Sequence, residues 1–73
     1  MGRYRSLEVE IDGRLATVRL NRPDRGNRLD SIMAAELADA FTDLAHEGEV
    51  WAVIISAAGP NFCLGADPED PPP

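Results

Sequence analysis

The fold is constrained most by the segment Val50–Ile55, in which every residue is apolar and most are β-branched. This composition predicts a strand, and the lack of alternation with polar residues predicts that both faces of the strand are covered. Such strands are typical of parallel sheets, in which a crossover helix connects each strand to the one before it. The segment therefore favours an α/β fold.

An amphipathic helix is expected directly before this strand. Its apolar stripe consists of Met33, Leu37, Ala40, Phe41 and Leu44. Their spacing of three and four residues places them on one side of a helix. Asp30 is the expected N-cap, and Gly48 is expected to close the helix in a left-handed conformation. Strand, helix and strand then form a right-handed βαβ unit.

A β-hairpin is expected before the βαβ unit. Residues 7–11 alternate between apolar and acidic side chains, and in residues 14–20 the apolar Ala16, Val18 and Leu20 alternate with Leu15, Thr17 and Arg19. This period of two is that of a strand with one buried face. Asp12-Gly13 lies between the two segments and is a preferred pair for a tight hairpin turn. The predicted fold class is α/β, with a β-hairpin followed by a βαβ unit.

The segment Asn21–Arg28 interrupts this pattern and is predicted to be a loop, because it combines proline, glycine and two asparagines. It also carries arginines, among them Arg25 and Arg28. A guanidinium can bind a phosphate through a fork of donors. The alternative is a solvent loop whose charges serve solubility, and the sequence leaves both interpretations open.

A second loop, Asn61–Asp67, leaves the carboxyl end of the predicted parallel strand, where α/β proteins place ligands. Asp67-Pro68 is typical of a helix start, whose free N–H groups attract anions and polarised carbonyl oxygens. We therefore interpret the Ala66 N–H as one half of an oxyanion hole. The alternative is that this loop only connects two elements and has no functional role. Pro71–Pro73 cannot sustain a helix, so the dipole at Ala66 is expected to be weak or absent.

The charges are divided unevenly along the chain. All seven basic residues are arginines at or before position 28, and nine acidic residues without a basic one follow, giving a net charge of −6. A protein that binds nucleic acid needs a broad basic surface, so we expect no nucleic-acid partner. A small anionic ligand held by a few arginines remains possible.

Length and cysteine content set further bounds. With 73 residues the chain forms at most one small domain of marginal stability. Its single cysteine, Cys63, excludes an internal disulfide and is expected to be a small buried residue rather than a nucleophile. His46 is expected near the end of the helix, without a catalytic role. No metal site, membrane span or secretion signal is evident, which favours a cytoplasmic setting.

Several motifs together resemble one family, the enoyl-CoA hydratase/isomerase or crotonase family. They are Leu20-Asn21-Arg22-Pro23 with Asn27 four residues later, the helix with Met33 and Leu37, the strand Val53-Ile54-Ile55, and Phe62-Cys63-Leu64-Gly65-Ala66-Asp67. Their order and spacing match the N-terminal part of that family from about Leu7 to Asp67. The resemblance implies the N-terminal part of a ClpP/crotonase-like spiral fold.

The resemblance also implies site residues. The family's Gly-Ala-Asp segment corresponds to Gly65, Ala66 and Asp67, and its alanine N–H donates to the thioester oxygen of an acyl-CoA. The family contacts CoA through the loop that matches Arg25, Gly26 and Arg28, and through backbone near Leu64, where a carbonyl accepts from the adenine amino group. CoA is part of the substrate, so no separate cofactor is implied. This chain departs from the family at three of these positions. It has Arg28 where the family usually has a small residue, Gly26 where a larger residue is common, and Leu64 where Ala or Ser is typical.

The resemblance further implies that the second oxyanion donor and the acid/base carboxylates lie beyond these residues. We therefore expect residues 1–67 to be the N-terminal part of a crotonase-like domain, residues 68–73 to be a proline-rich acidic tail, and the chain alone to be inactive. The complete protein would be a lyase or isomerase of fatty acid metabolism. Its partners would be an acyl-CoA and either further copies, in a trimer-based oligomer, or a complementary chain. The alternative is a non-catalytic module that binds acyl-CoA or another subunit.

Overall fold

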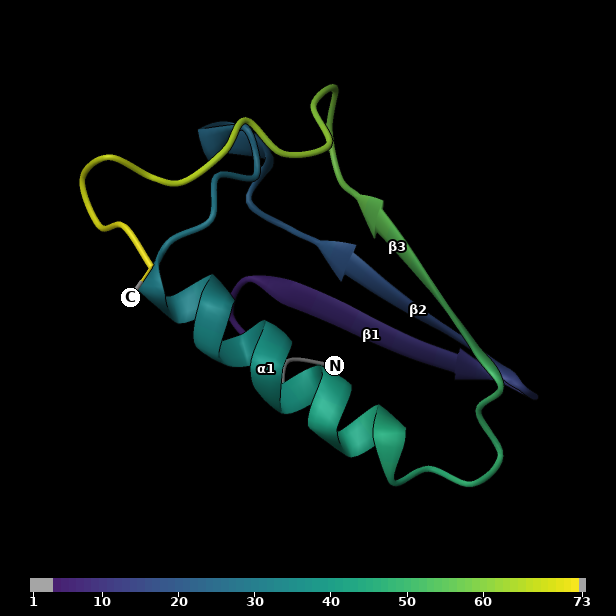
Figure 1. Ribbon diagram of the computed structural model, residues 1–73. Helices are drawn as coiled ribbons and strands as arrows, with labels where there is room; N and C mark the ends of the chain where they lie inside the picture. The colour runs from purple at the N-terminus through teal and green to yellow at the C-terminus, as the bar shows by residue number, and fades with distance from the viewer. Residues whose placement is uncertain (1–3, 73) are drawn as a thin grey trace.

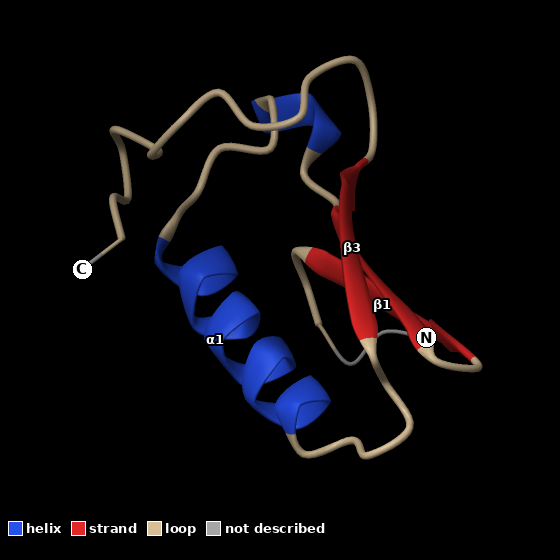
Figure 2. Cartoon of the chain, turned by 45° about the vertical axis from the view of Figure 1, so that its right-hand side comes forward, coloured by secondary structure: helices blue, strands red, loops and turns tan. Residues whose placement is uncertain are grey.

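The computed structural model describes residues 4–72, which form a three-stranded sheet with one long helix along it (Figure 1). In chain order the elements are the strands β1 (Leu7–Asp12) and β2 (Leu15–Leu20), the short 3-10 helix η1 (Pro23–Arg25), the helix α1 (Ser31–Ala45) and the strand β3 (Ala52–Ala57). Two loops meet beyond the ends of β2 and β3, above the start of α1 (Figure 2).

The strands β1 and β2 form the expected antiparallel hairpin, with Val9 opposite Val18. The turn lies one residue later than predicted, because Asp12 already pairs with Leu15 and the connection is Gly13-Arg14. Gly13 has a φ of 63°, which a residue without a side chain adopts at little cost. The hairpin is thus closed by a two-residue loop with glycine first.

The strand β3 is parallel to β2 and adjacent to it, so β2, α1 and β3 form the βαβ unit that the sequence predicts. In the sheet β2 is central, with β1 and β3 at the edges. Both β2 and β3 therefore end on the same side of the molecule, and the chain leaves each of them into one of the two loops (Figure 1).

The core lies between α1 and one face of the hairpin. Its fully packed apolar members are Leu7, Ala16, Val18, Leu20, Met33, Ala40 and Leu44. Alternation along β2 and the three- and four-residue spacing along α1 bring these residues together. Most of the predicted stripe is therefore correct, although Phe41 remains 37% exposed.

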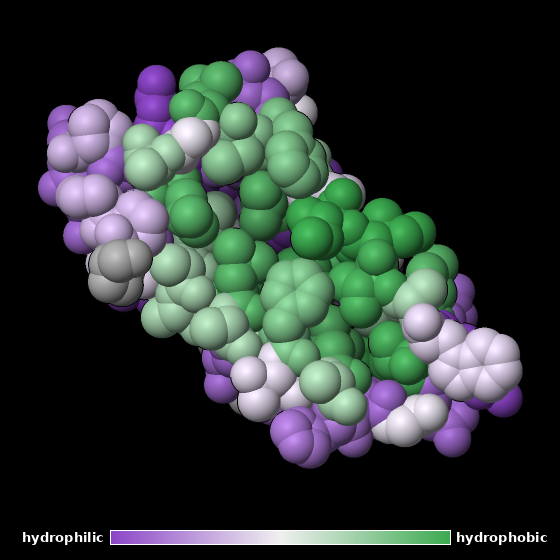
Figure 3. Space-filling model, in the orientation of Figure 1, coloured by the Kyte–Doolittle hydropathy of each residue, from purple (hydrophilic) through white to green (hydrophobic). Residues whose placement is uncertain are grey.

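The strand β3 is not covered in the way the sequence predicts. Residues 52–55 are exposed, and Ile54 and Ile55 keep 48% and 46% of their surface. The reason is that α1 packs over the hairpin side, which leaves β3 as an open edge. Apolar side chains accordingly gather on the visible face of the molecule (Figure 3). None of the helices in residues 4–72 is long and apolar enough to span a membrane.

The ends of α1 agree with the sequence at the start and differ at the finish. Asp30 is the N-cap, and its Oδ1 accepts a hydrogen bond of 2.7 Å from the Met33 N–H. The helix ends at Ala45 with His46 as C-cap, and Gly48 does not have the left-handed conformation that we predicted. The His46 Nδ1 lies 2.8 Å from the Thr42 carbonyl oxygen, so this ring closes the last turn instead.

Candidate functional site

Two loops, residues 21–30 and 58–67, are joined side by side through the buried side chain of Asn27. Its Nδ2 donates to the carbonyl oxygens of Ala58 and Asn61, at 2.8 and 2.7 Å. Its Oδ1 accepts from the Arg22 N–H at 2.7 Å. Asn27 has a φ of 54°, a conformation that asparagine tolerates better than most residues. One amide side chain therefore fixes both loops.

Farther along, the two loops pair as a short parallel bridge between Leu29 and Ala66. The Leu29 N–H donates to the Gly65 carbonyl at 2.9 Å, and the Asp67 N–H donates to the Leu29 carbonyl at 2.8 Å. Among the described residues there is no cis peptide bond. In a trans peptide the N–H points opposite to the C=O. Because the Gly65 carbonyl points at Leu29, the Ala66 N–H points away from it.

The Ala66 N–H has no hydrogen-bond acceptor within residues 4–72, and Ala66 is exposed. The bridge thus uses the Gly65 carbonyl and the Asp67 N–H in hydrogen bonds to Leu29, and the Ala66 N–H between them points outward without an acceptor among the described residues. A free, rigidly held N–H is what an oxyanion site requires.

Asp67 anchors this bridge through its side chain, which is only 3% exposed. Its Oδ2 lies 3.3 Å from Arg22 Nη2 and 3.2 Å from Arg25 Nη2. Its Oδ1 accepts a hydrogen bond of 2.9 Å from the Glu69 N–H. The Glu69 N–H, and then the two guanidinium groups, hold the pKa of Asp67 below its ordinary value, against the opposing effect of burial.

This pKa predicts a loss of stability in acid. A carboxyl whose pKa is lower in the folded state stabilises the fold above its unfolded pKa, near 3.8, and this contribution is lost as the pH falls through the folded value. We therefore expect the urea concentration at the unfolding midpoint to decrease as the pH is lowered below about 4. This decrease should be steeper for the wild-type chain than for Asp67→Asn. Parallel slopes for the two proteins between pH 5 and pH 2 would contradict the assignment.

Asp67 does not begin a helix, contrary to the sequence prediction. Residues 68–70 form a turn, which Asp67 closes through the Glu69 N–H and by accepting from the Asp70 N–H at 3.3 Å. Pro71 and Pro72 follow and have no N–H to donate to a helical ladder. A helix dipole at Ala66 is therefore absent from the described residues, as the prolines predict, and the orientation of its N–H comes from the Leu29 bridge.

Gly26 and Leu64 are in direct contact across the two loops. The Leu64 N–H donates to the Gly26 carbonyl at 3.1 Å. A Cβ placed on Gly26 would overlap the Leu64 Cδ1 atom and lie 2.9 Å from its Cγ. Gly26 also has a φ of 63° at the end of η1. The small residue at position 26 and the large one at position 64 therefore fit each other.

We expect Gly26→Ala to destabilise the chain by about 1–2 kcal/mol, because an L side chain is strained at this positive φ. The clash with Leu64 adds less, since that side chain is 52% exposed and free to rotate. The double variant Gly26→Ala with Leu64→Ala should therefore recover less than half of the loss in urea unfolding. Full recovery would mean that steric overlap, not backbone strain, excludes a side chain here.

The remaining predicted residues are placed around this junction. Arg25 is 42% exposed and bound to Asp67 and to Glu69, the latter at 3.1 Å. Arg28 is partly buried and forms no ion pair with a described residue. Cys63 is exposed, which corrects the prediction that it is buried. Within residues 4–72, no three potential ligand side chains gather to hold a metal ion.

Sequence reasoning missed two residues of the site. Arg22 and Asn27 were noted only as parts of a motif, and neither was assigned a role. The positive φ that asparagine favours is a weak signal for Asn27. For Arg22 the partners are Asp30 and Asp67, and the more distant of them is 45 residues away in sequence, so no local pattern reveals it.

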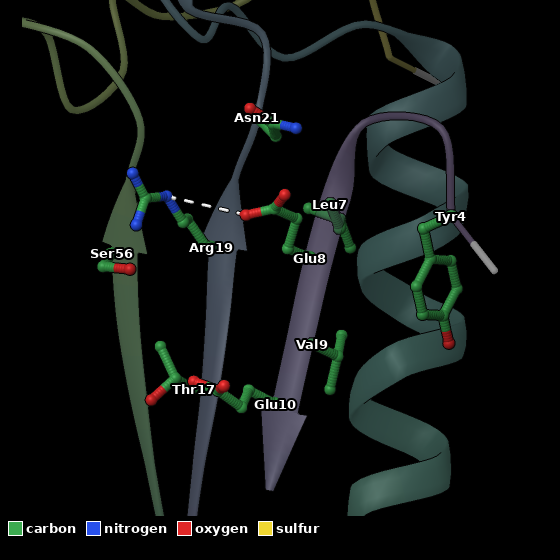
Figure 4. A pocket seen from close by; sticks show the side chains of 9 residues that line it. All are labelled: Tyr4, Leu7, Glu8, Val9, Glu10, Thr17, Arg19, Asn21 and Ser56. Atoms are coloured by element: carbon green, nitrogen blue, oxygen red, sulfur yellow. Dashed lines mark ion pairs between the residues drawn. The ribbon is translucent and has the colours of Figure 1, made fainter. Parts of the chain in front are cut away.

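The largest of the described cavities, about 570 Å³, lies elsewhere. Its lining is shown in Figure 4 and comes from all three strands, from Tyr4 and from Asn21. Across it Arg19 pairs with Glu8 at 3.7 Å, both being largely exposed. This hollow contains none of the predicted site residues. Neither do two smaller ones beside α1.

Comparison with known proteins identifies the family. The sequence pattern described as Enoyl-CoA hydratase/isomerase matches residues 10–71 of this chain. The chain belongs to the enoyl-CoA hydratase/isomerase family. A probable enoyl-CoA hydratase of Mycobacterium tuberculosis is 34% identical over 67 residues, which is 92% of this chain and 26% of that protein. A human Delta(3,5)-Delta(2,4)-dienoyl-CoA isomerase is 32% identical over 88% of this chain and 20% of its own length.

Solved structures of the enoyl-CoA hydratase/isomerase family confirm the predicted fold. An enoyl-CoA hydratase/isomerase from Mycobacterium paratuberculosis superposes with a TM-score of 0.86 at 38% identity, covering 89% of this chain and 26% of that one. The enoyl-CoA hydratase of Mycobacterium tuberculosis gives a TM-score of 0.85 at 31% identity, covering 89% and 28%. The hairpin and βαβ unit are thus a crotonase-type arrangement, and the chain spans about a quarter of the length of its relatives.

Proposed function

We propose that this chain is the N-terminal part of an enzyme that acts on acyl-CoA thioesters, and that its Ala66 N–H donates to the thioester oxygen. The observation that carries the proposal is the Leu29 bridge, which turns this N–H outward and leaves it without a partner in residues 4–72. A fixed donor aimed at a carbonyl oxygen stabilises the negative charge that develops there in enolate chemistry. Family membership supplies the substrate class.

The arginines of the first loop are proposed to meet the phosphates of CoA. Arg28 is the better candidate, because it lacks a carboxylate partner among the described residues. Arg25 would have to exchange its contacts with Glu69 and Asp67 for a phosphate. The Leu64 carbonyl is proposed to accept from the adenine. This carbonyl receives no hydrogen bond from residues 4–72.

We propose that the 73-residue chain alone has no hydratase or isomerase activity. The carboxylate nearest to Ala66 in sequence is Asp67, which is ion-paired with Arg22 and Arg25 and has a lowered pKa. Such a group is a poor general acid or base near neutral pH. The complete enzyme is proposed to be a cytoplasmic oligomer that draws its acid/base groups from other parts of the protein.

The test compares two CoA derivatives that differ only at the carbonyl, butyryl-CoA and its thioether analogue S-butyl-CoA. One hydrogen bond predicts that the thioester binds about three- to ten-fold more tightly. Equal affinity for both would contradict the role of Ala66, and binding of neither would contradict the CoA site. Turnover of an enoyl-CoA by the chain alone would contradict its inactivity.

A second function, a module that docks on another subunit, is favoured by one observation. The edge strand β3 exposes apolar residues to solvent, among them Val53, Ile54 and Ile55. Unpaired strand edges with apolar side chains are surfaces on which further strands add. Binding of neither CoA derivative, together with self-association measured by analytical ultracentrifugation, would favour this function over the first.

A further inference from the structure

The Arg22 guanidinium lies at the point where three parts of the site meet. Its Nη1 donates to the Arg28 carbonyl and lies 3.2 Å from Asp30 Oδ2, while its Nη2 lies 3.3 Å from Asp67 Oδ2. Only 15% of the side chain is exposed. The planar fork of arginine can hold acceptors in different directions at once, which a point charge cannot do equally well.

Each of these contacts fixes a different part of the junction. Asp30 is the N-cap of α1, Arg28 precedes the bridge residue Leu29, and Asp67 follows Ala66. The two carboxylates are 12% and 3% exposed. Without this guanidinium, both poorly solvated carboxylates would lose an ion pair, although Asp67 would keep the one with Arg25. Arg22 therefore links the start of the helix to the segment that contains Ala66.

We propose that Arg22 is the positioning residue of the Ala66 N–H. It holds the Asp67 carboxylate and the Arg28 carbonyl on the two sides of the Leu29 bridge, so that the Gly65–Ala66 peptide keeps its outward direction. Arg22 acts through these groups and is given no contact with the substrate. This inference rests on the proposed function, because a donor needs positioning only if it is used.

The experiment measures amide hydrogen exchange and binding of the two CoA derivatives for the wild-type chain, Arg22→Gln and Arg22→Lys. For Arg22→Gln we expect the Asp67 N–H to exchange about ten-fold faster or more, as the loss of charged hydrogen bonds predicts. Amides of β2 should be unchanged. The ratio of the affinity for butyryl-CoA to that for S-butyl-CoA should fall towards one, while the affinity for S-butyl-CoA stays the same. Lysine keeps the charge and should restore part of both effects.

A matched control is Arg19→Gln, which removes an exposed ion pair with Glu8 on the sheet and should leave exchange at Asp67 and thioester preference unchanged. Unchanged exchange at Asp67 in Arg22→Gln, or a retained thioester preference, would overturn the proposal. Equal acceleration in β2 would also overturn it, because Arg22 would then be a general stabiliser. If the wild-type chain shows no thioester preference, the proposed function fails and the positioning role fails with it, whereas a local exchange effect would still establish the Arg22 tether.

Discussion

Replacing Asn27 by alanine is expected to destabilise the chain by about 3 kcal/mol, because buried carbonyl and N–H groups that lose their partners each cost about 1–3 kcal/mol. Three hydrogen bonds end on this side chain, which is fully buried. Alanine is also strained at the φ of 54°. A chain of 73 residues has a total stability of roughly 4–11 kcal/mol, so the loss is a large fraction of it.

Urea unfolding followed by circular dichroism measures this loss. Asn61→Ala is the matched control, because Asn61 is exposed and contacts Asn27 through its backbone carbonyl. We expect that control to change stability by no more than about 0.5 kcal/mol. A similar small change for Asn27→Ala would mean that the two loops hold together without it.

Ala66→Pro is expected to abolish the preference for a thioester over a thioether, because proline has no N–H. The fold should tolerate the change. The Ala66 N–H takes no part in the Leu29 bridge, and proline is accepted in strands where the N–H faces outward. The two CoA derivatives should then bind equally, with the affinity that the wild-type chain has for S-butyl-CoA.

Ala66→Ser is the matched control for this variant, because it changes the side chain and keeps the N–H. It should retain the thioester preference, and its urea midpoint should lie close to that of the wild-type chain. A preference that survives in Ala66→Pro would show that another donor contacts the thioester oxygen.

The elements of the fold were predictable because each has a local signal. The Asp30 cap, the apolar stripe that begins at Met33 and the alternation along β2 depend on residues a few positions apart. The limits of this reasoning are visible at Gly48, which local chemistry marks as a helix terminator although α1 ends at Ala45 with His46 as its C-cap. Exposure of β3 was not predictable, since it depends on which elements are present to cover it.

For the candidate site, the sequence could propose Ala66 but could not give the contacts that orient its N–H. Ala66 was proposed from a helix start at Asp67 that does not form in the described residues. Its N–H is directed instead by backbone pairing with Leu29, across a gap of 37 residues that no spacing rule reaches. The contacts of Arg22 and the fit between Gly26 and Leu64 are likewise tertiary. The family resemblance supplied the proposed substrate, an acyl-CoA thioester, which local chemistry does not indicate.

The central claim is that the Ala66 N–H donates to the thioester oxygen of a bound acyl-CoA. The most direct measurement is the chemical shift of the Ala66 amide proton in a ¹⁵N-labelled chain titrated with butyryl-CoA and, separately, with S-butyl-CoA. The account predicts a downfield shift of this proton with the thioester that the thioether does not produce. Identical shifts with both derivatives, at saturation, would contradict it.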